Sequence, residues 1–205
     1  MKLRNTAIAL GVGAAAAAGL SLLKVNKDFV VGSTAVVIGA GLMIALKDKN
    51  DLNIKARNYE YFFNRAQDKF ELADYEDAIL DYNKALELSP TEICLVYSMR
   101  GNAKRNLGDF EGAISDQNKA LDFDPLYADG YFNRGIAKFK KGDFDGAIKD
   151  YSQVLKINPK DSDSFFNRAN VRKEMGEMKG ACEDWRKAAD LGDDDAAKLL
   201  RENCK

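Results

Sequence analysis

The sequence predicts an all-α protein, a solenoid of helix-turn-helix units preceded by two hydrophobic membrane helices. Three observations carry this prediction: a pattern that recurs four times, apolar residues at helical spacing within each copy, and two long uncharged stretches before the first copy. The copies cover residues 59–93, 94–127, 128–161 and 162–195, so the period is 34 or 35 residues. A repeat of this length is typical of a solenoid, in which each unit packs on its neighbours.

The two uncharged stretches, residues 6–23 and 29–46, are each 18 residues long. A helix of that length spans about 27 Å, close to the ~30 Å hydrocarbon core of a bilayer. Only five residues join the stretches, and small residues recur every four positions within them, as in closely packed transmembrane helices. We therefore expect residues 1–46 to form a membrane-spanning hairpin. A pair of buried helices in a soluble core is the alternative.

Lysine and arginine decide the expected orientation. They precede the first stretch at Lys2 and Arg4 and follow the second in a charged linker, residues 47–58. The positive-inside rule then places both termini, and the repeats, in the cytoplasm. The alternative is a cleavable N-terminal signal. Such a signal gives a secreted or periplasmic repeat protein only if the second stretch also fails to anchor the chain.

Each copy divides into two blocks with apolar residues at helical spacing. A short Gly-Asp sequence, as at 108–109 and 142–143, separates the blocks, so each unit is expected to be helix, turn, helix. Pro90, Pro125 and Pro159 follow the second blocks of the first three copies. Proline lacks a backbone N–H and disfavours helical geometry in the residue before it, so one helix pair ends there and the next begins.

Small residues recur in both predicted helices of every unit. Two helices approach closely only where neither carries a bulky side chain, so these positions predict the contact between the helices of a unit. They are Ala66, Gly101, Gly135 and Ala169 in the first helices and Ala78, Ala113, Ala147 and Ala181 in the second.

The third copy combines an aromatic residue, a small residue four positions on, then Ala-x3-aromatic and proline, at Tyr131, Gly135, Ala147, Tyr151 and Pro159. This pattern resembles the tetratricopeptide repeat, and the resemblance covers about two thirds of the chain. It implies that the first helices line a concave face that binds peptides or segments of partner proteins.

The chain departs from the family pattern at several positions. Gln117 replaces the second-helix aromatic residue of the second copy, and Asp193 replaces the proline of the fourth. Two positions of the repeat carry a cation in all four copies. Where the family often has leucine, this chain has the arginine column, Arg65, Arg100, Arg134 and Arg168. Where the family usually has an aromatic residue, it has Lys69, Lys104, Lys138 and Arg172.

The arginine column predicts ion pairs. An aspartate recurs in every second helix, and the small residues beside each arginine bring the two helices together. We therefore expect Arg–Asp pairs within a unit or between adjacent units, with a role in register more than in stability. The acidic partners are Asp81, Asp116, Asp150 and Asp184.

A capping helix is expected after the fourth copy. Asp193 to Asp195 follow Gly192 and suit the start of a helix, where they interact favourably with its positive end. Residues 196–205 then provide one apolar stripe and one charged face. Such a helix covers the exposed end of a repeat array.

Composition excludes several functions. The chain has no histidine, which removes the commonest general base and transition-metal ligand. The three cysteines lack metal-ligand spacing; Cys182 occupies a column of isoleucines and is expected in the core, with Cys204 near it. Residues 59–205 carry 23 Lys and Arg against 29 Asp and Glu, a net charge of −6 that disfavours nucleic acid. We expect no catalytic residue, no metal and no cofactor, and a protein-protein interaction scaffold.

Function is then expected on the concave surface of the first helices. Asparagines can hydrogen-bond an extended backbone, and phenylalanines offer apolar contacts, although some of these phenylalanines are alternatively core residues between repeats. The candidate peptide-binding residues are Phe63, Asn64, Asn102, Phe132, Asn133, Phe139, Phe166, Asn167 and Asn170.

The sequence disfavours one class of partner, the C-terminal carboxylate tails of chaperones. Family members that hold the C-terminal carboxylates of chaperones use asparagines together with lysines and an arginine. The corresponding positions here are Ser98, Asn102, Asn133, Asp163 and Asn167. Asn102 and Asn133 match the two asparagines, but Ser98, Asp163 and Asn167 stand where the cations are needed, so chaperone carboxylate tails are not expected partners.

Overall fold

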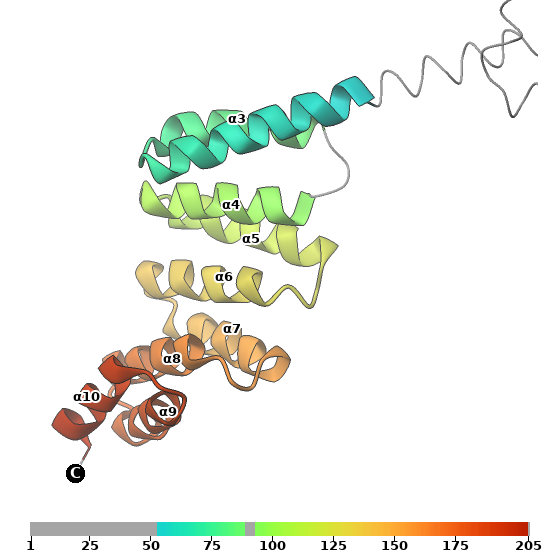
Figure 1. Cartoon of the computed structure of the whole chain (residues 1–205). Coiled ribbons are helices and arrows are strands. Elements are labelled where there is room, and N and C mark those ends of the chain that lie inside the picture. The colour runs from blue at the N-terminus through green and yellow to red at the C-terminus, as the bar shows by residue number, and fades with distance from the viewer. Residues whose placement is uncertain (1–52, 89–92, 205) are drawn as a thin grey trace, which may run out of the picture. The chain divides into compact units, whose positions relative to one another are not determined.

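The computed structural model describes residues 53–88 and 93–204, and these residues form helices and turns without a strand. The all-α repeat prediction is confirmed. The first helix covers residues 53–71. The helices that follow it, shown in Figure 1, are α3 (Tyr75–Leu88), α4 (Ile93–Asn106), α5 (Phe110–Phe123), α6 (Ala128–Lys141), α7 (Phe144–Ile157), α8 (Ser162–Glu174), α9 (Met178–Asp190) and α10 (Asp194–Asn203).

The predicted hydrophobic hairpin, residues 1–46, lies outside the described residues. Within the described ranges, no helix combines the length and the apolar character needed to cross a membrane. The predicted linker, residues 47–58, is helical from residue 53 onward. The first helix of the first unit therefore begins several residues before the repeated pattern does.

The turn inside each unit requires left-handed backbone geometry. Gly108, Gly142 and Gly176 hold φ values of 83°, 89° and 79°, a region that glycine adopts without steric cost. Ala73 takes the same place in the first unit with φ 60°. The next helix then begins at an aspartate in two units, where Asp109 accepts from the Gly112 N–H at 2.8 Å and Asp143 from the Gly146 N–H at 2.9 Å.

The small residues pack the two helices of each unit together, as predicted. All eight positions of the two small columns are buried. At Gly135 a Cβ atom would lie 3.0 Å from Cε1 of Tyr151, so a larger residue there would collide with the ring. Close approach at this column brings the aromatic side chains of the second helices fully into the core, at Tyr82, Tyr151 and Trp185.

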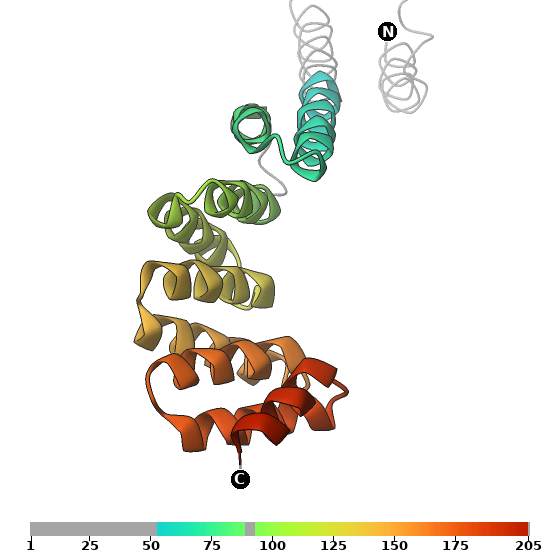
Figure 2. The same cartoon turned by 90° about the vertical axis from the view of Figure 1, so that its left-hand side faces the viewer.

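Successive helices pack on one another in chain order, and each unit contacts the next through its neighbouring helices. Figures 1 and 2 show this order from α4 to α10 in two views. The core accordingly forms separate clusters along the array: one around Tyr82, one around Tyr151 and one around Trp185.

The capping helix is present as α10, with the predicted cap at Asp193, which accepts from the Ala196 N–H at 2.8 Å. Ala196 is fully buried, and Leu199 and Leu200 pack against the cluster around Trp185. α10 therefore covers the end of the fourth unit.

Tyr82 provides a test of the core. Its hydroxyl is fully buried and has no hydrogen-bond partner among the described residues, and burial raises the pKa of Tyr82 to about 12. Tyr82→Phe keeps the ring against Phe63 but removes the unpaired hydroxyl. We expect an unchanged free energy of unfolding, or a gain of up to about 1 kcal/mol, at neutral pH.

The same variant should lose less stability in alkali. Unfolded tyrosine ionises near pH 10, whereas folded Tyr82 stays protonated to about pH 12. The unfolded state therefore releases a proton first, and stability falls as the pH rises through this window. Urea unfolding of the parent and Tyr82→Phe at about pH 8 and about pH 11 measures the difference. An identical alkaline loss in both proteins would contradict the assignment.

Candidate functional site

The predicted Arg–Asp pairs form in all four units. In each unit the arginine Nε and Nη2 donate to the two carboxylate oxygens of the aspartate, at distances between 2.6 and 2.9 Å. The pairs are Arg65–Asp81, Arg100–Asp116, Arg134–Asp150 and Arg168–Asp184. Two parallel hydrogen bonds fix the orientation of the guanidinium as well as the distance between the helices.

A second cation binds the same carboxylate in each unit. Lys104 Nζ lies 2.8 Å from Asp116 Oδ2, and Lys138 Nζ lies 2.8 Å from Asp150 Oδ2. Lys69 and Arg172 contact Asp81 and Asp184 at 3.0 and 2.6 Å. The sequence interpretation treated these cations only as departures from the family pattern. Their spacing, four residues after the arginine and therefore on the same helix face, was the signal that indicated a shared partner.

The aspartates are buried while their cations stay partly in water. Asp116 is 1% exposed, and the side chains of Arg100 and Lys104 are 13% and 22% exposed. In the first unit, the hydrogen bond from Arg65 is the main reason that the pKa of Asp81 lies below its usual value, against the opposing effect of burial. The hydrogen bond to Asp81 raises the pKa of Lys69. The first-unit cluster therefore favours the ionised form of Asp81.

The arginines also join one unit to the one before it. Arg100 Nη1 donates to Asn83 Oδ1 at 2.5 Å, Arg134 Nη1 to Asn118 Oδ1 at 2.6 Å, and Arg168 Nη1 to Ser152 Oγ at 2.8 Å. The predicted contribution to register has its physical basis here, because one side chain contacts three helices. In the first unit, Arg65 Nη1 instead contacts the Tyr61 hydroxyl at 2.9 Å.

The candidate phenylalanines differ in how deeply their side chains are buried. Phe63 is only 9% exposed and packs on Tyr59 and Tyr82, so it belongs to the core rather than to an accessible surface. Phe132 and Phe139 are half-buried, with Phe132 against Tyr151 and Phe139 against Phe144. Phe166 is also half-buried and packs against the Trp185 cluster.

The candidate asparagines fall into two groups. Asn102 and Asn170 are half-buried and contact the second helix of their own unit: Asn170 Oδ1 accepts from Trp185 Nε1 at 3.1 Å, and Asn102 Oδ1 lies 3.5 Å from Gln117 Nε2. Asn64 is exposed, and Asn133 and Asn167 are half-buried. Asn167 Nδ2 donates to the Asp163 carbonyl of its own helix at 2.8 Å.

A cavity of about 200 Å³ opens between the first helices of the third and fourth units. One candidate residue, Phe132, lines it. Two of its acidic residues, Asp129 and Asp163, come from the first turns of α6 and α8. The complete lining is Ala128, Asp129, Phe132, Val154, Asn158, Asp161 and Asp163.

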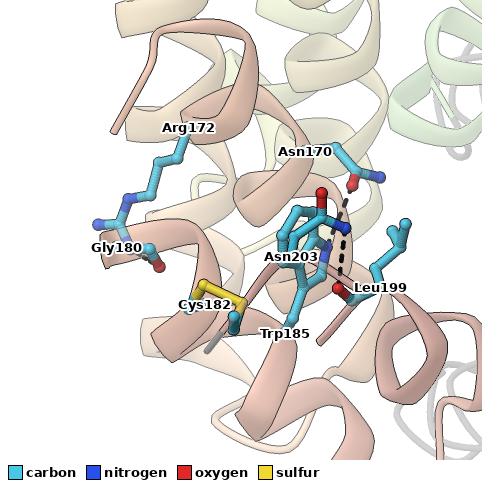
Figure 3. Close-up of a disulfide and its surroundings, with 8 residues drawn as sticks. Asn170, Arg172, Gly180, Cys182, Trp185, Leu199 and Asn203 are labelled. Atoms are coloured by element: carbon cyan, nitrogen blue, oxygen red, sulfur yellow. Dashed lines mark hydrogen bonds between the residues drawn. A yellow bond between two sulfur atoms is a disulfide. The ribbon is translucent and has the colours of Figure 1, made fainter. Parts of the chain in front are cut away.

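The fourth unit carries a disulfide that the sequence interpretation did not predict. Cys182 of α9 is bonded to Cys204 at the C-terminal end of α10, with their Cα atoms 5.8 Å apart (Figure 3). Cys182 is half-buried rather than a core residue. The isoleucines of this column, Ile79, Ile114 and Ile148, are half-buried as well, so the column marks a half-buried position rather than a core position. The expected proximity of Cys204 is confirmed.

No group of three or more potential ligands capable of holding a metal ion occurs in residues 53–88 and 93–204. Cys94 is a free thiol whose pKa is raised by burial.

Comparison with known families identifies the repeats. Models described as tetratricopeptide repeat match residues 59–92 and 128–161, and one described as TPR repeat matches residues 101–142. No curated protein sequence matches the chain.

Solved structures share the fold at low sequence identity. The crystal structure of MamA is 22% identical, with a TM-score of 0.63 over 73% of this chain and 86% of that one. The first TPR of Spaghetti (RPAP3), bound to the HSP90 peptide SRMEEVD, is 24% identical, with a TM-score of 0.56 over 58% and 94% of the two chains. The Arabidopsis OM64 TPR domain is 21% identical, with a TM-score of 0.56 over 58% and 98%. These likenesses concern the fold alone.

Proposed function

We propose that this chain, which belongs to the tetratricopeptide repeat family, is a scaffold that binds a segment of a partner protein across the first helices of its repeats. The observation that supports this best is the cavity between α6 and α8, because it is hollow, lies between first helices and combines the aromatic face of Phe132 with polar side chains. A small site that combines apolar side chains with hydrogen-bonding groups suits a side chain of a peptide.

The charge of this cavity favours a partner segment without carboxylates. Asp129, Asp161 and Asp163 all line it, and the repeat region has an excess of acidic residues. The HSP90 peptide seen with the RPAP3 domain ends in Glu-Glu-Val-Asp. Such a peptide would bring like charges together here, which is unfavourable. We therefore propose a neutral or basic partner segment.

We further propose that residues 6–46 anchor the chain in a membrane and that the repeats face the cytoplasm. The two uncharged stretches and the flanking lysines and arginines support this arrangement. An alkaline carbonate wash of membranes tests the anchor, because integral hairpins resist extraction. Release of the chain into the wash would contradict it.

One observation favours the second candidate, a secreted or periplasmic repeat-type binding protein. Disulfides persist in oxidising compartments and are rare in the cytosol, and Cys182–Cys204 is a disulfide in this structure. Alkylating the thiols of intact cells before lysis distinguishes the candidates. Blocked Cys182 and Cys204 indicate a reducing compartment, and an intact disulfide indicates an oxidising one.

The binding face is tested by Asn133→Ala combined with Asn167→Ala, once a partner has been captured by crosslinking in native membranes. Loss of two hydrogen bonds to the partner backbone should weaken binding about tenfold. The melting temperature should not change, because neither side chain is buried in the core. Titration of the purified partner segment measures the affinity.

Two exposed second-helix residues provide the matched control, as Asp122→Ala combined with Lys149→Ala. This control variant should bind as the parent does. Equal affinity of both double variants would place the interaction outside the Asn133 and Asn167 column.

A further inference from the structure

The disulfide between α9 and α10 is placed where it controls the end of the array. We propose that Cys182–Cys204 is a reducible lock on the capping helix: a dithiol reductant opens the bond, and α10 then undocks from the fourth unit. The two cysteines are 22 residues apart in sequence, and one of them lies at the last turn of α10 (Figure 3).

Solvent reaches the bond. Cys182 and Cys204 are both half-buried, and both line a surface cavity of about 440 Å³. Met178, Lys179, Glu183, Arg186 and Asn203 complete its walls. A small thiolate can therefore approach either sulfur, and Lys179 and Arg186 supply positive charge beside its path.

Apart from the disulfide, α10 is held on α9 by apolar packing. Its 10 residues are fewer than an isolated helix needs to be stable in water. Ala196 is its only fully buried residue, and Leu199 and Leu200 are partly buried. Among the described residues, no ion pair and no side-chain hydrogen bond connects α10 to α8 or α9. The disulfide is thus the main link at its C-terminal end.

The chemistry is a two-electron exchange with a dithiol. One thiolate of the reductant attacks one protein sulfur, and the other cysteine leaves as a thiolate and takes up a proton. The second thiol of the reductant then attacks the mixed disulfide and releases the first cysteine. The protein gains two electrons and two protons, and the reductant becomes a cyclic disulfide.

Undocking would uncover the apolar end of the array without unfolding the other units. Trp185 belongs to the cluster that Ala196, Leu199 and Leu200 cover. Because solenoid units contact only their neighbours, the effect should stay within α9 and α10.

Hydrogen exchange of the full chain, before and after treatment with dithiothreitol, tests the lock. In the oxidised protein, mass spectrometry should show a chain lighter by two hydrogens. After reduction, the amides of residues 194–204 should exchange faster, on the order of a hundredfold, because the constraint on this loop is lost. Amides of α4 to α7 should be unchanged.

Two variants separate the lock from other thiol effects. Cys94→Ser removes the remaining thiol and should respond to dithiothreitol as the parent does. Cys182→Ser combined with Cys204→Ser should exchange fast at residues 194–204 with and without reductant.

The chain's single tryptophan gives a second readout, because quenching of Trp185 by acrylamide should increase on reduction in the parent but not in the double variant.

Three results would overturn the proposal. The first is equal protection of residues 194–204 in the oxidised and reduced chain. The second is a failure of Cys182 and Cys204 to form their disulfide when the purified, reduced chain is treated with oxidised glutathione. The third is a loss of protection that spreads through α4 to α7.

Discussion

Replacing Asp116 with alanine is expected to lower the free energy of unfolding of the repeats by about 3 to 5 kcal/mol, because the change leaves two partly buried cations without their anion. Asp116 is 1% exposed and accepts from Arg100 at 2.6 and 2.8 Å. Lys104 lies 2.8 Å from the same carboxylate. Urea unfolding followed by circular dichroism measures the loss.

Three comparisons identify the cause. Asp122→Ala removes an exposed carboxylate of the same helix that has no ion pair or hydrogen bond in the described part of the chain, and should cost less than about 0.5 kcal/mol. Asp81→Ala should cost less than Asp116→Ala, because the Arg65 side chain is 36% exposed and rehydrates more easily. Replacing all three partners with Leu and Met should restore much of the loss. Equal costs at Asp116 and Asp122 would contradict the role of the cluster.

Trp185→Ala is expected to cost a similar amount, about 3 to 5 kcal/mol, for a different reason. The side chain is fully buried and is the largest in the core of the fourth unit. Its removal leaves a cavity and takes the donor from Asn170, whose Oδ1 accepts from Nε1 at 3.1 Å. Thermal unfolding followed by far-ultraviolet circular dichroism should show a lower melting temperature.

Trp185→Phe is the matched control. It keeps most of the ring volume but leaves Asn170 Oδ1 without its donor, so its cost should lie well below that of Trp185→Ala. Asn170→Ala then measures the hydrogen bond without the cavity. A Trp185→Ala protein that melts at the temperature of the parent would show that the fourth unit does not need this side chain.

The repeated positions were predictable because the same packing environment recurs in each of the four units. The small residues, the turn sequences and the Arg–Asp pairs all follow from columns in the sequence. The lysine column was misinterpreted, since the family pattern directed attention to the missing aromatic residue instead of to the nearby aspartate. Asp116 shows that one carboxylate satisfies both cations.

Burial could not be predicted from equivalent repeat positions at the ends of the array, where a residue has different neighbouring side chains. Phe63 is buried because its ring packs on Tyr59 and Tyr82, and the other copies have no aromatic residue at the position of Tyr59. Cys182 forms a disulfide because Cys204, at the end of α10, lies beside it, a neighbour that the other units lack. For the candidate site, periodicity identified a helix face but not the depth of each side chain. That depth depends on the side chains that the neighbouring helices place around each position.

The reach of each arginine into two units has a consequence for exchanging units. Arg134 needs Asp150 within its own helix pair and an acceptor, Asn118, in the preceding pair. Arg168 donates instead to a serine hydroxyl, Ser152 Oγ, in the preceding pair. A helix pair can therefore be duplicated, deleted or moved along the array without losing these bonds, provided that the pair before it offers any small hydrogen-bond acceptor at this position. The hydrogen bonds between neighbouring helix pairs are therefore interchangeable, even though the surfaces of the pairs differ.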